Sequence, residues 1–214
     1  KQTMWLTQLL KEHADESAAK FPDAIKQIMR NAIDALSESQ LTSKALKTGD
    51  QFPSFTLPNA KGAEVDSKTI LEHGPLVIAF YRGGWCPYCN IELKALQSAL
   101  PEFKTKGAQL LAISPESPDN SLSTVEKNNL EFEVLTDNNN HFAKSINLVY
   151  QLPQELVSLY KKFGIDLEES QDNSSNELPI SATYVIDTSG KIIYDFIEED
   201  YKLRADPNEI LSVL

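Results

Sequence analysis

The two cysteines of the chain, Cys86 and Cys89, are separated by two residues and follow an apolar run at residues 76–80. That run favours a β-strand, two glycines come after it, and leucines spaced as on one helix face follow the cysteines. This order predicts a strand, a loop and the first turn of a helix that carries both sulfurs. Unpaired backbone N–H groups and the helix dipole favour negative charge there. Because the thiolate is the nucleophilic form of cysteine, the spacing predicts redox chemistry.

Structural uses of the two cysteines are less favoured. A disulfide across so short a loop removes little entropy from the unfolded chain. A zinc site needs more Cys or His ligands, but the three histidines stand singly at positions 13, 73 and 141. We therefore expect no metal and no cofactor. Two inert thiols remain the structural alternative, although Pro87 and the preceding Trp85 supply the stiff turn and apolar wall that a redox loop needs.

The segment from Phe80 to Glu92 resembles the active-site motif of the peroxiredoxins, the alkyl hydroperoxide reductase and thiol-specific antioxidant family. The pattern Phe-Tyr-Pro-x-x-x-Thr-x-x-Cys-x-x-Glu lies on it without a gap, whereas thioredoxins typically have one residue fewer in the loop. This resemblance implies that Cys89 is the peroxidatic cysteine. Further stretches beginning at positions 49, 107 and 182 also resemble the family, so the resemblance covers residues 48–214.

Three positions depart from the family motif. Cys86 stands where peroxiredoxins have Thr or Ser, and Arg82 stands where they have proline. Ser181 replaces a distal arginine that, in the family, lowers the cysteine pKa and polarises the peroxide. Thioredoxin-fold proteins carry a cis-proline at about that position, so its absence also counts against a plain thioredoxin. The chain thus resembles a peroxiredoxin-like subgroup that has a Cys-x-x-Cys dithiol.

The elements expected around the motif alternate between strands and helices, which indicates an α/β fold. The resemblance specifies a thioredoxin-like fold of the peroxiredoxin type with an N-terminal helical extension. We expect a helical arm at 1–47, helical from residue 3, and a peroxiredoxin-like domain at 48–214. The arm carries one apolar stripe between Phe21 and Leu36. We prefer an arm packed on the domain, and a homodimer arm is the alternative.

The sequence predicts most boundaries of the domain. Expected are a hairpin at 55–66, strands at 76–82, 108–114 and 132–136, and helices at 87–104, 118–130 and 139–147. An inserted helix at 153–163 and a polar stretch at 168–177 predict a lid or mobile loop. A closing hairpin at 182–197 and a last helix from Asp206, with Glu209 supporting its cap, complete the chain.

Charge and hydropathy limit location and partners. The formal net charge is -11 and the pI is about 4.8, which argues against binding to nucleic acid or to anionic membranes. No run approaches the ~18 apolar residues of a membrane span, and no stretch suits a signal peptide. We expect a cytoplasmic location and partners that are small molecules or proteins. Because the sequence starts at Lys1, N-terminal processing stays open.

Four residues form the predicted site: the catalytic Cys89 and Cys86 and the substrate-binding Arg82 and Trp85. Arg82 could replace the missing distal arginine, with an exposed ion pair as the alternative. Trp85 is expected to cover the sulfur. We expect Glu92 to complement the helix dipole, and we assign no chemistry to Arg204.

Three functions stay open at this point. In a thiol peroxidase, one sulfur attacks a hydroperoxide, the other resolves the sulfenic acid, and thioredoxin or glutathione reduces the disulfide. In a thiol-disulfide oxidoreductase, Cys86 attacks a partner's disulfide and Cys89 releases it. A redox-responsive binding protein without turnover is the third alternative. We interpret the sequence as an antioxidant oxidoreductase of the first kind, because the fold and the loop length favour it.

Overall fold

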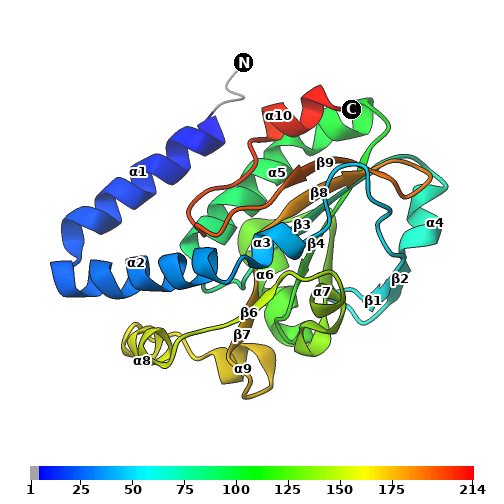
Figure 1. Ribbon diagram of the computed structural model, residues 1–214. Helices are drawn as coiled ribbons and strands as arrows, with labels where there is room; N and C mark the ends of the chain where they lie inside the picture. The colour runs from blue at the N-terminus through cyan, green and yellow to red at the C-terminus, as the bar shows by residue number, and fades with distance from the viewer. Residues whose placement is uncertain (1–4) are drawn as a thin grey trace.

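The computed structural model describes residues 5–214, and its centre is a five-stranded mixed sheet (Figure 1). The strand order is β5-β4-β3-β8-β9. The β3–β4 and β4–β5 pairs are parallel, whereas the β3–β8 and β8–β9 pairs are antiparallel. The strands are β3 (Leu76–Phe80), β4 (Gln109–Ser114), β5 (Glu133–Thr136), β8 (Thr183–Ile186) and β9 (Ile192–Phe196). The predicted α/β class and the predicted order of strands are confirmed.

The central strand β3 is buried on both faces, as expected for a strand between two helical layers. Successive side chains of a strand point to opposite faces, so Val77 and Ala79 share one core cluster while Ile78 and Phe80 share the other. The first layer contains α5 (Pro87–Thr105), α6 (Pro118–Asn128) and α10 (Pro207–Ser212). The second contains α4 (Ser67–Leu71) and α7 (His141–Ser145), which the 3-10 turn η1 (Asn138–Asn140) precedes in the chain. Together the layers fix the end of β3, from which the cysteine loop starts.

The predicted first hairpin is present as β1 (Thr56–Pro58) and β2 (Glu64–Asp66). It lies at the edge of the domain, where Asn59 forms an isolated bridge with Leu135 of β5. Phe55, just before β1, packs into the second core cluster. The hairpin therefore closes the second layer and takes no part in the site.

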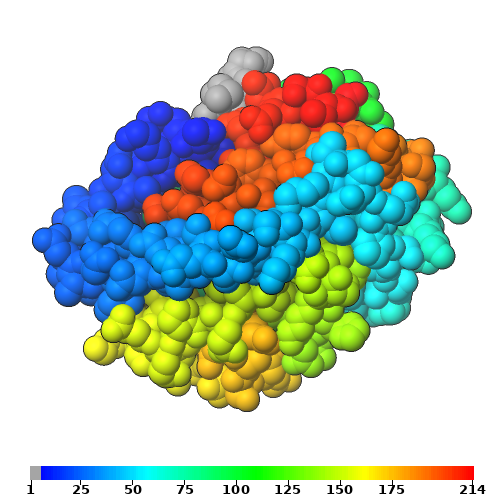
Figure 2. All heavy atoms as spheres, in the orientation of Figure 1, coloured from blue at the N-terminus to red at the C-terminus, as the bar shows by residue number. Residues whose placement is uncertain are grey.

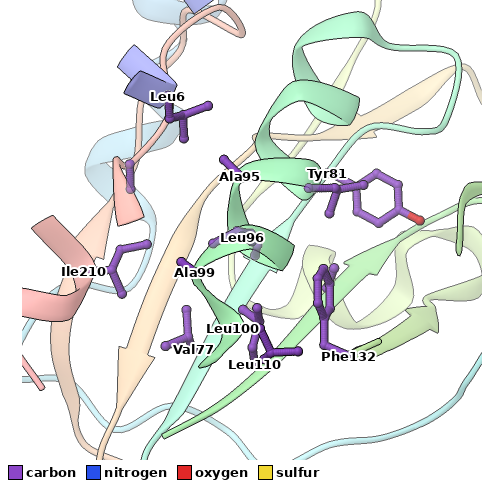
Figure 3. Packing of buried hydrophobic residues seen from close by; sticks show 14 of the residues in the cluster. Leu6, Val77, Tyr81, Ala95, Leu96, Ala99, Leu100, Leu110, Phe132 and Ile210 are labelled. Atoms are coloured by element: carbon purple, nitrogen blue, oxygen red, sulfur yellow. The ribbon is translucent and has the colours of Figure 1, made fainter. Parts of the chain in front are cut away.

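The N-terminal arm packs on the domain through two helices that make different contacts. Helix α1 (Trp5–Lys20) runs along α5, and its Leu6 faces the same helix as Ile210 of α10 (Figure 3). Helix α2 (Asp23–Glu38) instead contacts α8 (Gln154–Lys162). The expectation of a helix over residues 3–47 is wrong for residues 21–22 and 39–40, which separate α1, α2 and α3 (Leu41–Lys44), and for residues 45–47, which follow α3. Positions 3 and 4 lie outside the described residues.

The long connection between α7 and β8, predicted to be a lid or a mobile loop, is folded on itself and packed. Strands β6 (Val149–Gln151) and β7 (Glu177–Pro179) pair at its two ends and so close it. Between them, α9 (Leu167–Gln171) is capped by the Asp166 side chain, which accepts from the backbone N–H groups at 168 and 169. Leu178 is fully buried in a small cluster with α8. The segment is therefore a packed subdomain that supports α2.

The C-terminal helix starts as predicted, but its acidic residues have other roles. Asp206 caps α10 and also accepts from the Thr7 hydroxyl at 3.0 Å, which ties α1 to α10. Glu209, expected to support the cap, accepts instead from the Tyr194 hydroxyl. The cap prediction for Glu209 was wrong because β9 brings a donor to it across space. Within residues 5–214, no helix has both the length and the apolar character that crossing a membrane requires.

Candidate active site

The two cysteines lie at the start of α5, after the loop that connects it to β3. Cys86 is the N-cap residue of α5, Pro87 occupies the first turn, and the backbone N–H of Cys89 donates to Cys86 Sγ at 3.4 Å. Proline suits this position because its missing N–H would be unpaired there anyway. Both thiols are free and buried. The first helical turn thus directs an N–H group at the sulfur of Cys86, as the sequence predicted.

Cys86 is the thiol that favours ionisation. Burial by itself would raise its pKa, but the hydrogen bond from Cys89, the charges of Arg82 and Arg204 and the Cys89 backbone N–H lower it well below the ordinary value of 9.0. The Arg82 Nη1 atom lies 3.8 Å from Cys86 Sγ. A thiol at a helix N-terminus beside a cation is the setting in which reactive thiolates occur.

Cys89 has the opposite tendency although it also has donors. Burial, the hydrogen bond with Cys86 and the charge on Cys86 raise its pKa well above 9.0, against the attraction of Arg204 and Arg82. Its Sγ accepts from the Arg82 backbone N–H at 3.4 Å and faces Arg204 Nη2 at 3.5 Å. The surroundings therefore favour the negative charge on Cys86 and the proton on Cys89.

A buried ion pair connects the C-terminal segment to the cysteine helix. Arg204 Nη1 lies 2.7 Å from Glu92 Oε1, and both side chains are at most 1% exposed. Burial raises the pKa of Glu92 to about 7, with the charge of Arg204 opposing the rise. The expectation that Glu92 complements the helix dipole is incomplete, because Glu92 is buried and forms an ion pair with Arg204. Arg204, to which the sequence gave no chemistry, is the residue that brings a guanidinium to Cys89.

Arg82 is enclosed by aromatic rings, so the alternative of an exposed ion pair was wrong. Its guanidinium carbon lies 4.9 Å from the Trp85 ring centroid, 5.8 Å from that of Tyr160 and 4.8 Å from that of Tyr201. It also donates to the Tyr160 hydroxyl. Such cation–π contacts stabilise a buried guanidinium that lacks a carboxylate partner. Trp85 was expected to cover the sulfur. Its ring instead contacts the Arg82 guanidinium, which in turn faces Cys86 Sγ.

A second buried carboxylate shapes the loop before Cys86. Glu116, which follows β4, accepts from the Tyr81 hydroxyl at 2.9 Å, from the Thr124 hydroxyl at 3.0 Å and from the Gly84 N–H at 2.8 Å. A Cβ atom on Gly84 would lie 2.4 Å from the Thr124 hydroxyl oxygen, so a side chain there would displace α6. The glycine and the carboxylate together fix the path of the loop.

A cavity of about 610 Å³ opens in front of Cys86. Its walls come from α1, α2, the cysteine loop, the end of α8 and residues 200–202. In Figure 2 the blue arm and the orange segment near residue 200 border each other on the face shown. Cys86 lines this cavity, whereas Cys89 lies behind it in the core. A small molecule that enters therefore meets Cys86 first.

Comparison with known proteins places this site in a family. A profile of the AhpC/TSA family matches residues 48–195. The chain belongs to the AhpC/TSA family. It is similar to Peroxiredoxin Bcp of Escherichia coli (strain K12), with 25% identity over 169 residues that make up 79% of this chain and 96% of that protein. A putative peroxiredoxin bcp of Buchnera aphidicola is 33% identical over 130 residues, 61% of this chain and 80% of that one.

Solved structures agree on the fold of this AhpC/TSA protein. The crystal structure of Peroxidoxin BcpB from Mycobacterium tuberculosis covers 78% of this chain and 96% of its own, with a TM-score of 0.64 and 22% identity. A Xanthomonas campestris bacterioferritin comigratory protein gives a TM-score of 0.57 at 16% identity, covering 74% of this chain and 88% of its own. The predicted family, its thioredoxin-like fold and the thiol-based oxidoreductase class that goes with them are confirmed.

The departures from the family motif have structural consequences. Ser181, in place of the family's distal arginine, is buried beside the end of β3, where Phe80 donates to the carbonyl at 182, and its hydroxyl has no partner among the described residues. The guanidinium near Cys89 comes instead from Arg204, outside the matched span of the AhpC/TSA family. All four predicted site residues meet in one place. Their roles stay predictions.

Sequence reasoning missed Arg204, Glu116 and Tyr160. Tyr160 lies on the inserted helix, and no local pattern links it to a loop 78 positions away. Glu116 follows a buried strand and a proline, which is a weak signal for a residue at the sheet edge where sites form. Arg204 follows the acidic run at residues 198–200 by four positions, a composition typical of a solvated segment, so its burial was not predicted. All three act through contacts between distant segments.

Proposed function

We propose that this AhpC/TSA protein is a thiol peroxidase in which Cys86 attacks the peroxide and Cys89 resolves the product. The observation that carries the proposal is Cys86 itself. It caps α5, faces a guanidinium, has a lowered pKa and lines the cavity. The same four properties are what a nucleophile for a small neutral oxidant needs.

In the first step the Cys86 thiolate attacks the terminal oxygen of a hydroperoxide. An S–O bond forms, the O–O bond breaks, and the leaving alkoxide takes a proton to become an alcohol. The sulfur is oxidised to a sulfenic acid and the peroxide is reduced by the same two electrons. The Arg82 guanidinium, 3.8 Å from this sulfur, is placed to stabilise the charge that develops on the oxygens.

In the second step Cys89 attacks the sulfenic sulfur of Cys86. An S–S bond forms and the S–O bond breaks. The hydroxide leaves as water with the proton that Cys89 gives up. Arg204 and the Arg82 backbone N–H stabilise the Cys89 thiolate in this step. Two external thiols, those of reduced thioredoxin or of two glutathione molecules as the resemblance implies, then restore Cys86 and Cys89 by two successive exchanges and are themselves oxidised to a disulfide.

The order of attack departs from the register that the family resemblance implies. That register gives the peroxidatic place to Cys89, which lies behind Cys86 and has a raised pKa. Cys86 has the lower pKa and lines the cavity through which a substrate would enter, so the proposal assigns it the first attack. Because α1 and α2 line the cavity that leads to Cys86, we also propose that the arm, residues 1–47, and the domain at 48–214 form the active site together.

The second candidate function is reduction of protein disulfides. A Cys-x-x-Cys whose first thiol caps a helix supports it. Against it stands the cover of α1 and α2, which leaves Cys86 1% exposed and so out of reach of a disulfide on a protein surface. Reduction of insulin by this protein at a rate above its peroxide consumption would favour this candidate over the first.

The decisive experiment compares the two single serine variants in rapid-mixing peroxide consumption. We expect Cys86→Ser to be inactive and Cys89→Ser to consume one equivalent and retain a sulfenic acid that dimedone traps. The wild type should lose both thiols and two hydrogens in mass. The reverse assignment, with Cys89→Ser inactive, would restore the family register, and two free thiols after stoichiometric peroxide would reject the peroxidase.

A further inference from the structure

The two sulfurs are enclosed, although the proposed cycle needs an outside thiol to reach them. Cys86 is 1% exposed and Cys89 is fully buried. A small peroxide can enter the cavity in front of Cys86, which has a volume of about 610 Å³. Thiol–disulfide exchange, in contrast, requires the sulfur of the reductant to contact a sulfur of the disulfide. A protein reductant carries its thiol on a folded surface, so part of the enclosure has to move before it can react.

Helix α2 is the loosely held part of that enclosure. Of its 16 residues, Leu36 alone is buried. The apolar side chains that pack against the cluster around α8 are half-buried: Ile25, Ile28, Met29 and Ala32. Within residues 5–214, no ion pair joins α2 to the domain, and the hydrogen bond that it receives from the domain runs from the Tyr201 hydroxyl to Met29 Sδ, 3.7 Å away. Because a thioether sulfur is a weak acceptor, few interactions oppose a displacement of α2.

The helices on either side of α2 are held more firmly. In α1, Leu6 and Leu10 are buried in the core cluster that contains α5. In α3, the Thr42 hydroxyl donates to Glu199 of the C-terminal segment at 2.7 Å. The start of the arm and its end are therefore anchored, and α2 lies between the anchors.

Breaks in the helical backbone flank α2 at both ends. They lie at residues 21–22 and 39–40. Gln40 has a φ of 58°, a left-handed conformation that favours glycine. Figure 1 shows the corner between α1 and α2 at the edge of the molecule, away from the central sheet. These breaks are the places where the chain can bend if α2 moves away from the domain.

The inner face of α2 rests on the aromatic rings around Arg82. A small cavity between them is lined by Met29, Ile33, Arg82, Tyr160 and Tyr201. Tyr160 belongs to α8, which α2 contacts, and Tyr201 donates to Met29. The guanidinium carbon lies 5.8 Å from the ring centroid of Tyr160 and 4.8 Å from that of Tyr201. A displacement of Arg82 or of these rings therefore reaches α2.

Oxidation removes the negative charge that faces Arg82. This arginine is 3% exposed, lies 3.8 Å from Cys86 Sγ through Nη1, and has no ion pair with a carboxylate within residues 5–214. When Cys89 attacks the sulfenic sulfur of Cys86, the S–S bond forms, the S–O bond breaks, and hydroxide leaves as water with the proton of Cys89. The resulting disulfide is neutral. A buried charge without a counter-charge is strongly destabilising, so the disulfide form favours a displacement that admits water to Arg82.

From these observations we propose that α2 is a redox-operated lid. It is closed while Cys86 carries negative charge beside Arg82, and it opens when Cys86 and Cys89 form a disulfide. The open lid admits the thiol of a protein reductant, and the closed lid keeps protein disulfides away from the reduced site. Helix α2 precedes residue 48, where the AhpC/TSA match begins, so the lid lies outside the matched span. This inference rests on the proposed function for the natural oxidation step, but the lid can be measured without peroxide.

The first test follows α2 by hydrogen–deuterium exchange and mass spectrometry. The wild type is compared in its reduced form and after oxidation by diamide, which takes two electrons and two protons from the thiols and becomes a hydrazine. A 16-residue helix without tertiary packing frays, so opening speeds the exchange of its amides. We expect residues 23–38 to exchange about tenfold faster in the disulfide form, as for the loss of one charge-assisted contact, while residues 5–12 keep their rates.

A mass loss of two hydrogens verifies that diamide has formed the disulfide. Equal exchange of α2 in the two forms overturns the proposal. Absence of an intramolecular disulfide after diamide treatment overturns it as well, because the lid then has no oxidised form to open.

Serine variants test the charge without any oxidant. Cys86→Ser places a neutral hydroxyl beside Arg82, so its α2 amides should exchange about tenfold faster than those of the reduced wild type. Cys89→Ser keeps the thiol of Cys86 and is the matched control, with the exchange of the reduced wild type. Circular dichroism checks that both variants are folded. Wild-type exchange of α2 in a folded Cys86→Ser contradicts the role of the charge.

Removal of the guanidinium tests the same coupling from the other side. Arg82→Met has no buried cation to compensate, so the redox difference in α2 exchange should fall from about tenfold to less than about twofold. Asn31→Ala, an exposed change on α2, is the control and should keep the full difference. A full redox difference in Arg82→Met would overturn the assignment of Arg82 as the link between the sulfur and the lid.

The two proposals fail in different ways. If α2 opens in the disulfide form made with diamide but hydroperoxides are not consumed, the peroxidase proposal is wrong and the lid stands. If hydroperoxides are consumed through Cys86 and α2 exchanges equally in both redox forms, the peroxidase stands and this inference is wrong.

Discussion

Two arginines from different parts of the chain lie beside the two sulfurs, and only one of them has a carboxylate partner among the described residues. Arg82 belongs to the cysteine loop and faces Cys86 among aromatic rings, and no carboxylate of residues 5–214 forms an ion pair with it. Arg204 comes from the C-terminal segment and faces Cys89, but it forms an ion pair with Glu92 at 2.7 Å. One guanidinium therefore keeps its full charge beside a sulfur, while the other shares it with a carboxylate.

This difference gives the two halves of the site different tasks. The uncompensated charge beside Cys86 favours its thiolate, the form that the proposed first attack needs. The compensated charge beside Cys89 fixes the segment that closes the core, and the pKa of Cys89 is raised. An AhpC/TSA site that lost the family's arginine at position 181 thus regains positive charge from two other directions. Three substitutions test this division of tasks.

The largest effect is expected when the buried pair is broken. Arg204→Met leaves Glu92 without its partner and should lower the free energy of unfolding by about 3–5 kcal/mol at alkaline pH. Urea unfolding at about pH 6 and about pH 9 measures it. Lys144→Met, which breaks the partly exposed pair with Glu177, is the control and should cost at most about 1 kcal/mol.

The pH dependence of that loss follows from Glu92. Its pKa is about 7 in the folded wild type and has an ordinary value of 4.5, so wild-type stability falls as pH rises from about 4.5 to about 7. Without Arg204 the folded pKa rises further, and the fall continues to higher pH. The difference in unfolding free energy between the wild type and Arg204→Met should therefore increase above about pH 7. An equal deficit at both pH values would show that Glu92 is not ionised in the wild type.

A smaller effect is expected from the unpaired arginine. Arg82→Met removes the cation beside Cys86 and should raise its pKa by about one unit, equivalent to ~1.4 kcal/mol. Peroxide consumption should slow about tenfold. The pH profile of alkylation by iodoacetamide in the Cys89→Ser background reports the pKa directly. Arg82→Lys keeps a charge and should recover part of the rate, and an unchanged profile in Arg82→Met would assign Arg82 a packing role only.

The smallest effect should come from the residue that orients Arg82. Tyr160→Phe removes the hydroxyl that accepts from the guanidinium but keeps the ring beside it. Loss of one hydrogen bond should slow peroxide consumption about threefold. Tyr194→Phe, which loses a hydroxyl bonded to Glu209 on another face, is the matched control. A fall as large as that of Arg82→Met would mean that the position of the guanidinium, which the Tyr160 hydroxyl fixes, matters as much as its charge.

The limits of sequence reasoning show most clearly at Glu92 and in segment 148–179. A glutamate on the first turns of a helix has a sufficient local explanation in the helix dipole, and only the packing of the C-terminal segment shows that it is buried. The polar composition of residues 168–177 suits a mobile loop. Pairing of β6 with β7 closes it, and this depends on strands that are more than 20 residues apart.

The sequence by itself determined the strand–loop–helix unit, the place of both sulfurs on the first helical turn, the alternation of strands and helices, and the family. These follow from local periodicity, turn residues and a contiguous motif, which are physical properties of neighbouring residues. Only the tertiary structure decided which charges face which sulfur. Arg204, Tyr160 and the arm reach the site across long sequence separations, and their electrostatic effect depends on burial and on distances of a few ångströms.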